Sequence, residues 1–309
     1  MRLGLDVGGT KTDAVAMAPN GTIVARARLA TGWGADAVVR TILDAVAALR
    51  ADPALAAADI RSVGIGIPGR IEPGSGRVEH AVNLGVETLD LAAAVAPVLG
   101  VAVRVENDVK AAALGAASLR GAAQSMGYLN LGTGIAAAIV TDGALWRGAR
   151  GGAGEIGHLS IDPAGPVCRC GQRGCIEALA GGGAVSARWG KPGALPIRDV
   201  FDAADAGDPV AVRLRTDLAR GVAAAIRVLV LTADVDTVVL GGGITTLGTR
   251  LQGEVAAHLD ASARESAFLR SLQLVARVEI LPVGAPAAAL GAALIGAEAA
   301  GEREVVSRG

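Results

Sequence analysis

The sequence predicts an α/β protein built of two lobes. Its 309 residues are more than one hydrophobic core usually serves. Strand-like and helix-like segments alternate over residues 36–118, which is typical of parallel strands joined by helices. A strand–loop–strand–turn–strand pattern occurs twice, over residues 3–29 and 128–149. We therefore expect one lobe over 1–118 with the closing segment 286–309, and a second over 119–285.

The two copies of the repeated pattern share their turns and their loops. Each has a two-residue turn of the strongest hairpin type, Asn20-Gly21 in the first copy and Asp142-Gly143 in the second. Each also opens with a Gly/Thr loop directly after an apolar strand. Two related lobes facing each other are the expected result.

The remaining elements follow from hydrophobic periodicity. Helices are predicted over 36–50, 89–99, 108–118, 197–232 and 286–299. Strands are predicted over 60–67, 101–106, 237–243 and 274–281, and turn-rich or irregular stretches over 68–86, 147–154 and 158–177.

The composition excludes several classes of protein. Hydrophobic residues make up 51% and charged residues 19%, which is a globular composition. The net charge of −1 gives no basic face for nucleic acid. We find no signal peptide and no apolar run long enough to span a membrane, so we expect a cytoplasmic protein with reduced or metal-bound cysteines.

The loops that open the two copies are suited to phosphate. Glycine lets backbone N–H groups approach phosphate oxygens, and Thr and Lys add donors and charge. A Walker A loop is excluded because a strand, not a helix, follows. Either loop alone could be an ordinary tight hairpin, but their pairing favours a triphosphate clamp. The clamp residues are Gly8, Gly9, Thr10 and Lys11 after Asp6, and Gly132, Thr133 and Gly134.

Two further glycine clusters are less specific. Residues 64–69 match the dinucleotide pattern G-x-G-x-x-G, but Pro68 and the turns after it do not open a helix, so that reading is rejected. Gly241, Gly242 and Gly243 end a strand and enter a helix. They are either a surface for adenosine or a simple tight turn.

Asp108 is the candidate catalytic base. It lies with Asn107 where the strand 101–106 gives way to a helix, and ligands bind at the carboxyl ends of such strands. Phosphoryl transfer to an alcohol needs a group that orients the hydroxyl and accepts its proton. Both residues are also common helix caps, so this alternative stays open.

The three cysteines predict a small zinc-binding loop over 158–177. Cys168, Cys170 and Cys175 lie within eight residues, and His158 stands ten residues before the first of them. Three thiolates and one imidazole form a closed tetrahedral Zn²⁺ site of the structural kind. The loop has little core of its own, so we expect the metal to fold it.

These motifs together resemble the ROK family (repressors, open reading frames, kinases), and within it the glucokinase-like sugar kinases. The resemblance covers essentially the whole chain. It is carried by LGLDVGGTK (3–11), GIPG (66–69), ENDVKAA (106–112), LNLGTGI (129–135), GEIGH (154–158), CRCGQRGCIE (168–177) and VVLGGGI (238–244).

The resemblance implies a two-lobed actin-like ATPase, or hexokinase-type, fold that binds ATP, Mg²⁺ and a sugar. It implies that Asp108 is the base, that Asp6 lies on the Mg²⁺ side, and that 241–243 meet adenosine. It also implies a homo-oligomer, either a dimer or a tetramer, with neither nucleic acid nor membrane as partner. The implied sugar ligands are Gly69, Asn83, Asn107, Asp108, Glu155, His158 and Glu177.

The expected reaction is phosphorylation of a hexose 6-hydroxyl, with glucose first. The chain departs from many relatives at Lys110, where Asn is common, at Gly85, near which glucokinases carry an aromatic residue, and at Gly181, where Ser is common. The loss of bulk near Asn83 keeps N-acetylglucosamine and N-acetylmannosamine as alternatives, and fructose is a further alternative. A sugar-responsive regulator without kinase activity is disfavoured because the base and both phosphate loops are present.

Overall fold

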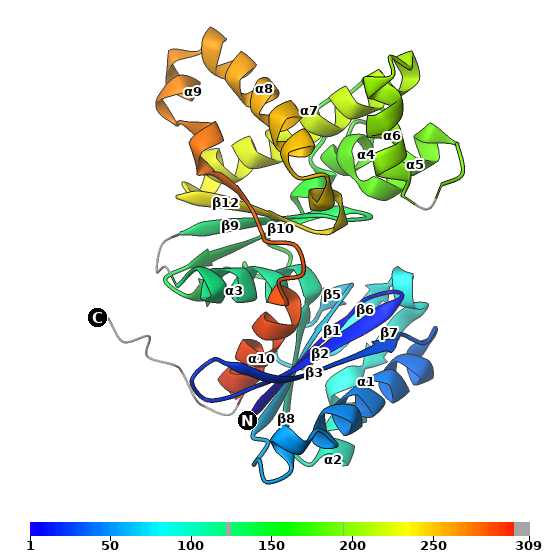
Figure 1. The fold of residues 1–309 in the computed structure, drawn as a ribbon, viewed down its shortest axis with the longest axis vertical. Helices are drawn as coiled ribbons and strands as arrows, with labels where there is room; N and C mark the ends of the chain where they lie inside the picture. The colour runs from blue at the N-terminus through cyan, green and yellow to red at the C-terminus, as the bar shows by residue number, and fades with distance from the viewer. Residues whose placement is uncertain (122–124, 194, 300–309) are drawn as a thin grey trace. The chain divides into compact units, whose positions relative to one another are not determined.

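The computed structural model describes residues 1–121, 125–193 and 195–299 (Figure 1). Its contacts divide the chain into two compact units. The first comprises Met1–Ala123, Gly143–Ala153 and Pro286–Gly309, and the second comprises Gln124–Asp142 and Gly154–Ala285. The tail 301–309 lies outside the described residues.

The first unit is built on a five-stranded sheet of order β3-β2-β1-β4-β8. The first three strands form an antiparallel meander, and β1, β4 and β8 are parallel. A smaller antiparallel sheet of order β5-β6-β7 follows β4 in the chain. The bounds are β1 Arg2–Val7, β2 Lys11–Met17, β3 Ile23–Ala30, β4 Ser62–Ile67, β5 Arg70–Ile71, β6 Arg77–Ala81, β7 Val86–Asp90 and β8 Ala102–Asn107.

The helices of this unit pack on the large sheet and around its edges. They are α1 Ala35–Arg50, α2 Leu91–Leu99, α3 Asp108–Arg120 and α10 Ala287–Ala299, with short 3₁₀ turns η1 Pro53–Leu55 and η2 Val82–Leu84. The apolar stripe of α1, which includes Val38, Ile42 and Leu49, is fully buried in the same core as the strand residues Leu5 and Ile65. Burial of this stripe is what holds α1 in place.

The sheet of the second unit repeats the strand arrangement of the large sheet in the first unit. It has the order β11-β10-β9-β12-β13, in which β9 and β10 are antiparallel and β9, β12 and β13 are parallel. The helix α7 runs through a large core that includes Leu129, Ile176, Phe201 and Leu218. The strands are β9 Met126–Leu131, β10 Ile135–Thr141, β11 Ala144–Leu145, β12 Thr237–Gly241 and β13 Val278–Ile280. The helices are α4 Ile176–Ala180, α5 Gly182–Trp189, α6 Pro196–Asp205, α7 Pro209–Ala233, α8 Thr249–Glu265 and α9 Ala267–Ser271, with 3₁₀ turns η3 Ile156–His158, η4 Gly243–Leu247 and η5 Leu274–Arg277.

Most predicted elements appear within a few residues of their expected bounds, and the differences have local causes. The helical stretch 197–232 is two helices, because Pro209 begins α7 and Asp208 caps it by accepting from the Val210 and Ala211 amides. The strand expected over 274–281 is shorter, because residues 274–277 form the 3₁₀ turn η5. The turn-rich stretch 68–86 contains the short hairpin of β5 and β6.

Residues 143–153 belong by their contacts to the first unit, whereas the sequence-based boundary placed them in the second. Two long-range contacts account for this placement. Arg147 Nε donates to Glu106 Oε2 at 2.7 Å, and Lys110 Nζ donates to the carbonyl oxygen of Gly151. Both contacts come from residues around the start of α3. No helix in the described part of the chain is long and apolar enough to cross a membrane.

The helix α10 packs against β1, β4 and α3 (Figure 1), and the backbones approach closely. Glycine makes this possible. A methyl group added to Gly4 or Gly64 of the strands would overlap the carbonyl oxygen of Ala289 or Ala292 in α10. A methyl group added to Gly115 of α3 would likewise overlap the carbonyl oxygen of Ala287. The C-terminal helix therefore closes the core of the first unit by backbone contact.

We predict that Gly64→Ala destabilises the protein by about 3 kcal/mol or more, because the obstructing atom is backbone and cannot rotate away. Gly253→Ala is the matched control. Gly253 lies inside α8 with nothing within 4 Å of an added methyl group, so the change should stabilise by up to about 1 kcal/mol. Urea unfolding of both variants measures the difference. Equal stability of the two would contradict the packing described.

Candidate active site and metal centre

The three parallel strands of the first unit bring their carboxyl ends to one edge of the sheet. Asp6 of β1 pairs in register with Gly66 of β4, and Ile67 of β4 pairs with Asn107 of β8. Asp108 begins α3 directly after β8. The candidate base and the candidate Mg²⁺-side carboxylate therefore lie at the same edge, where ligands bind in open α/β sheets.

The first phosphate loop is a tight turn between β1 and β2. The Gly8 amide donates to the Lys11 carbonyl at 2.9 Å, and Gly9, Thr10 and Lys11 are exposed. An added methyl group on Gly9 would lie 2.9 Å from the carbonyl oxygen of Asn83. The loop thus lies directly against the segment that carries a candidate sugar ligand.

Asp6 stands in a strongly negative environment. Burial first, and then the charges of Asp108 and Asp13, raise its pKa to about 7 against an opposing effect of Lys11. Asp13 pairs with Arg28, and Lys11 lies 3.7 Å from Asp13, so these cations are shared. Clustered carboxylates of this kind fit a divalent cation, which would relieve the repulsion.

Asn107 both caps a helix and reaches a candidate ligand-binding loop. Its side-chain oxygen accepts from the Val109 and Lys110 amides at 3.0 and 3.3 Å, as a helix N-cap does. Its amide nitrogen donates to the Gly69 carbonyl at 3.2 Å. The capping alternative is therefore correct for Asn107, and the cap fixes the backbone from which Asp108 projects.

Two contacts fasten the segment 143–153 around the start of α3. Glu106 accepts from Arg147, and Lys110, whose side chain is buried, donates to the Gly151 carbonyl. The departure from the family pattern at Lys110 thus has a structural use. Glu106 and Lys110 flank Asp108 on both sides, so the two contacts hold the candidate base between fixed neighbours.

Trp33 is a residue that the sequence analysis missed. It is 71% exposed, which is unusual for a Trp, and its indole covers Gly85. A methyl group on Gly85 would lie 2.5 Å from Trp33 Cε2. The Gly34 amide donates to the Leu84 carbonyl at 2.8 Å and ties the two segments together. An exposed aromatic ring therefore stands beside Asn83 after all, and its flanking glycines in TGWG were the available signal.

The second unit repeats the same edge with its own loops. Gly241 at the end of β12 pairs in register with Asn130 of β9, so the loops 132–134 and 241–243 lie side by side. Gly242 packs against the Leu131 carbonyl, where a methyl group would lie 2.5 Å from the oxygen. The amides of Gly182 and Gly183 donate to the carbonyls of Gly132 and Thr133 at 2.9 Å each. The loop backbone is thus fixed by the start of α5, and Thr133 and Gly243 remain exposed.

Glu177 supports the second phosphate loop. Its Oε2 accepts from the Ile135 amide at 2.9 Å, and Gly134 leaves room for this carboxylate. Glu155 is exposed and directly precedes η3, where Gly157 packs against the Ile135 carbonyl. The candidate sugar ligands of this unit therefore surround the first residue of β10.

His158, Cys168, Cys170 and Cys175 form one cluster whose ligand atoms all lie within 4.8 Å of one another. The Cys170 and Cys175 sulfurs are 3.7 Å apart, and Cys168 Sγ lies 3.8 Å from His158 Nδ1. A tetrahedron with metal–sulfur bonds of about 2.3 Å has edges of about 3.8 Å. The spacing therefore fits a tetrahedral metal ion bound by three thiolates and one imidazole.

The charge of the cluster also calls for a cation. Hydrogen bonds from Gln172 lower the pKa of the Cys170 thiol to about 6, whereas burial and the neighbouring thiols raise that of Cys175 to about 12. A thiol with so high a pKa becomes a thiolate ligand only when a cation compensates its charge. The isolated bridges Ser160–Cys175 and Val167–Arg173 give the loop little secondary structure of its own.

The predicted site residues thus fall into two sets, one in each unit. The first unit holds Asp6, Gly8, Gly9, Thr10, Lys11, Gly69, Asn83, Asn107 and Asp108. The second holds Gly132, Thr133, Gly134, Glu155, His158, Cys168, Cys170, Cys175, Glu177, Gly241, Gly242 and Gly243.

Comparison with known proteins decides the family. The family model described as "ROK family" matches residues 2–298. The chain belongs to the ROK family. The predicted actin-like ATPase fold is confirmed by a solved ROK glucokinase from Streptomyces griseus in complex with glucose and AMPPNP. That structure has a TM-score of 0.77 and 27% identity, covering 96% of this chain and 99% of the other.

Curated ROK relatives carry two different names. A glucokinase of Halalkalibacterium halodurans is 31% identical over 283 residues, covering 84% of this chain and 86% of the relative. An N-acetylmannosamine kinase of Escherichia coli O139:H28 is 34% identical over 299 residues, covering 90% of this chain and 99% of the relative. Similarity alone therefore does not separate these two sugars.

We predict that Asp6→Asn stabilises the protein and that the gain grows with pH. A carboxyl whose folded pKa of about 7 exceeds its unfolded value favours folding less as pH rises through this range. Relative to wild type, the variant should gain about 2–3 kcal/mol more at pH 8 than at pH 5. Urea unfolding at both pH values measures this. A gain that does not change with pH would contradict the raised pKa.

We also predict one tightly bound metal ion per chain. Elemental analysis of protein purified without chelator should find it, and Cys170→Ser should lose most of it, because a closed site needs all four ligands. Ser160→Ala, which removes a hydroxyl from the same loop but no ligand, is the control. Metal-free native protein, or equal metal content in both variants, would contradict the assignment.

Proposed function

We propose that this ROK protein is an ATP-dependent kinase that phosphorylates the 6-hydroxyl of a hexose, with glucose as the first acceptor. The observation that carries the proposal is the place of Asp108. It lies at the carboxyl edge of the β1, β4 and β8 strands, at the same edge as Asp6 and the loop 8–11. A base, a cation-binding carboxylate and a phosphate loop are the parts that phosphoryl transfer needs.

The proposed step transfers the γ-phosphoryl group of ATP to the sugar. Asp108 accepts the proton of the 6-hydroxyl while the sugar oxygen attacks the γ-phosphorus. The bond from that phosphorus to the β–γ bridging oxygen breaks, and ADP leaves with the electron pair. Bound Mg²⁺ would supply charge neutralisation at the phosphates, and Asp6 is the residue proposed to hold it.

The proposed nucleotide contacts come from three glycine-containing loops. Residues 8–11 and 132–134 present exposed backbone and the Thr10 and Thr133 side chains to phosphate. Residues 241–243 lie beside 132–134 and offer a surface free of side chains for adenosine. The Streptomyces griseus relative, solved with an ATP analogue, supports this part of the proposal.

The proposed acceptor contacts combine hydroxyl-binding groups with one aromatic ring. In the first unit, the Asn83 backbone lies against Gly9 of the phosphate loop, and the Asn107 side chain donates to the Gly69 carbonyl. Trp33 adds an exposed apolar face beside Asn83, of the kind on which the C–H face of a sugar ring can lie. Glu155, His158 and Glu177 of the second unit remain proposed sugar ligands on the family motif.

Trp33 favours glucose over the N-acetylated alternatives. The alternatives rest on lost bulk at Gly85, but Trp33 covers that glycine. A site that keeps an aromatic ring at this place has less room for a 2-acetamido group. The N-acetylmannosamine kinase relative keeps that sugar as the second candidate, and fructose and a sugar-responsive regulator are weaker ones.

We further propose that the metal in the cysteine cluster is Zn²⁺ with a structural role. The donor set of three thiolates and one imidazole leaves no open position for catalysis. His158 and Glu177 lie at the two ends of this loop, so the ion would fix both candidate sugar ligands. We also propose that the protein acts in cytoplasmic sugar metabolism such as glycolysis and assembles as a dimer or tetramer.

We predict that Asp108→Asn lowers kcat for glucose phosphorylation by about 10²–10⁴-fold, the usual effect of removing a general base. The Asn oxygen can still accept from the Val109 amide, so the fold should be kept. Asp44→Asn, at an exposed position of α1, is the control with the same charge change. A coupled ADP-release assay measures both. Near-normal turnover of the Asp108 variant would refute its role as base.

The acceptor is tested by a panel of glucose, N-acetylglucosamine, N-acetylmannosamine and fructose in the same assay. We predict the highest kcat/KM for glucose, and a KM for glucose raised about tenfold in Trp33→Ala with kcat little changed, because a lost binding surface weakens ground and transition states alike. A higher kcat/KM for an N-acetylhexosamine would refute the glucose assignment but not the kinase. Sugar binding without turnover of any sugar would favour a regulator.

A further inference from the structure

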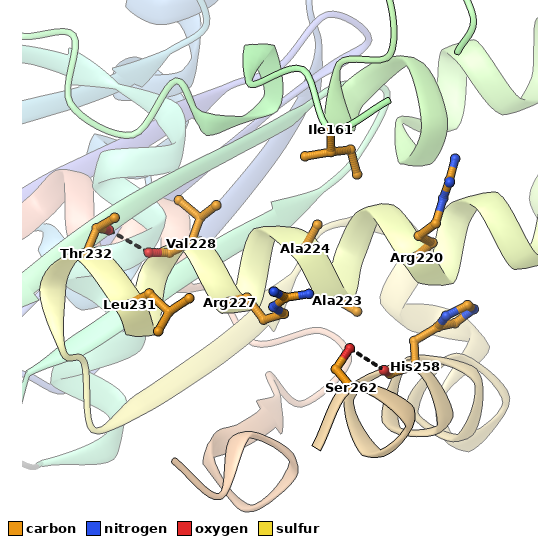
Figure 2. Close-up of a pocket in the computed structure, with 10 residues that line it drawn as sticks. All are labelled: Ile161, Arg220, Ala223, Ala224, Arg227, Val228, Leu231, Thr232, His258 and Ser262. Atoms are coloured by element: carbon orange, nitrogen blue, oxygen red, sulfur yellow. Dashed lines mark hydrogen bonds between the residues drawn. The ribbon is translucent and has the colours of Figure 1, made fainter. Parts of the chain in front are cut away.

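A pocket of about 550 Å³ lies in the second unit between α7 and α8, and none of the candidate site residues lines it (Figure 2). Its volume is within the range of small-molecule sites in proteins. Its lining contains none of the four cysteine-cluster residues and no glycine loop, although Ile161 belongs to the loop 158–177. The residues that line it are Ile161, Arg220, Ala223, Ala224, Arg227, Val228, Leu231, Thr232, His258 and Ser262.

The lining combines an apolar surface with cationic and polar groups. Ala223, Val228 and Leu231 of α7 give apolar surface, while α7 also provides two arginines and α8 provides His258 and Ser262. None of the described residues that line the pocket is acidic. The charge balance of the lining therefore favours an anionic occupant.

The two arginines differ in their partners. Arg220 Nε, like Arg227 Nε, is buried without a hydrogen-bond partner, but Arg220 lies 2.8 Å from Asp162 and 3.7 Å from Asp217, so its charge is compensated. Within the described part of the chain, no residue forms a hydrogen bond or an ion pair with the Arg227 side chain, and its Nε is buried without a partner. Figure 2 shows its guanidinium on the side of α7 that faces His258 and Ser262.

An unpaired buried donor is costly. Leaving such a group without an acceptor is unfavourable, and more so when the group is charged. The hydroxyls nearby do not relieve it, because Ser262 donates to the His258 carbonyl at 3.2 Å and Thr232 donates to the Val228 carbonyl at 2.5 Å, each within its own helix. An acceptor supplied by a ligand would satisfy Arg227.

We infer that this pocket binds a small organic anion that has an apolar body. The oxyanion, a carboxylate or a phosphate, is held by the Arg227 guanidinium, whose planar fork matches two oxygens at once. The apolar body lies against Ala223, Val228 and Leu231. This site is separate from the proposed kinase site and does not depend on Asp108.

The test uses phenyl phosphate and benzoate, which share an aromatic body but carry different oxyanions, with phenol as the neutral control. Titration calorimetry should give a Kd of about 1 mM or tighter for at least one anion and no binding of phenol. The tighter of the two anions identifies phosphate or carboxylate as the preferred group. Absence of binding by both anions overturns the proposal.

Variants assign the binding to the pocket. Arg227→Leu should weaken the anion at least tenfold and should fold normally, because the side chain has no described partner to lose. Arg213→Leu, at an exposed position of the same helix, removes the same charge and should leave Kd unchanged. An equal loss in both variants indicates general electrostatic attraction and overturns the proposal.

Sedimentation velocity excludes one further occupant. If this face is covered by a second copy of the chain, Arg227→Glu lowers the oligomeric state and the anions do not bind wild type. That outcome overturns the proposal. An unchanged sedimentation coefficient with retained anion binding in wild type supports it.

Discussion

The first unit depends on one close approach of backbones, between α10 and the strands β1 and β4. Gly4 and Gly64 have no side chain, so carbonyl oxygens of Ala289 and Ala292 can lie directly on the sheet. Dispersion attraction is strongest at such short range, and no rotamer entropy is lost. A helix from the end of the chain is thereby fixed on strands from its beginning. The same contact fixes the parallel strands whose carboxyl ends carry Asp6 and lead to Asp108.

The rigid sheet of the first unit keeps negatively charged side chains close together at its carboxyl edge. Asp6 is buried and lies near Asp108 and Asp13, and the cost of both shows in its raised pKa. A flexible loop would move such charges apart, whereas neighbouring strands cannot. The stored repulsion becomes useful when a divalent cation and a phosphate chain arrive, because both then bind where the protein has already been organised. The protein thus loses folding stability at Asp6, next to the residue proposed as the base.

The second unit uses the same strand order for a different purpose. Its carboxyl edge holds glycine loops instead of clustered aspartates, and the unit also holds the cysteine cluster. Glu177 links the two, because its carboxylate accepts from Ile135 at the start of β10 and it follows Cys175 by two residues. The cysteine loop and the second phosphate loop are thus parts of one supported structure. A substitution that displaces one of these loops is therefore expected to displace the other.

Features that depend on neighbouring residues could be predicted from the sequence alone. The alternation of strands and helices, the repeated meander, the cysteine cluster and the strand-end position of Asp108 all lie within short stretches, where backbone geometry follows from residue type and spacing. The predicted helical stretch 197–232 was wrong in extent because Asp208 caps a new helix at Pro209, and the predicted strand 274–281 because residues 274–277 form the turn η5. The family follows from motifs of the same short kind.

Only the tertiary structure decided what distant segments do to one another. Trp33 covers Gly85 across about fifty residues of chain, and Lys110 and Glu106 hold the segment 143–153. The unpartnered Arg227 became visible only when α7 and α8 enclosed it. Such contacts are set by how whole elements pack, and packing depends on the shape of every side chain in the core. The sequence by itself therefore determined the elements and the chemistry at their ends, and the packing decided which of those ends meet.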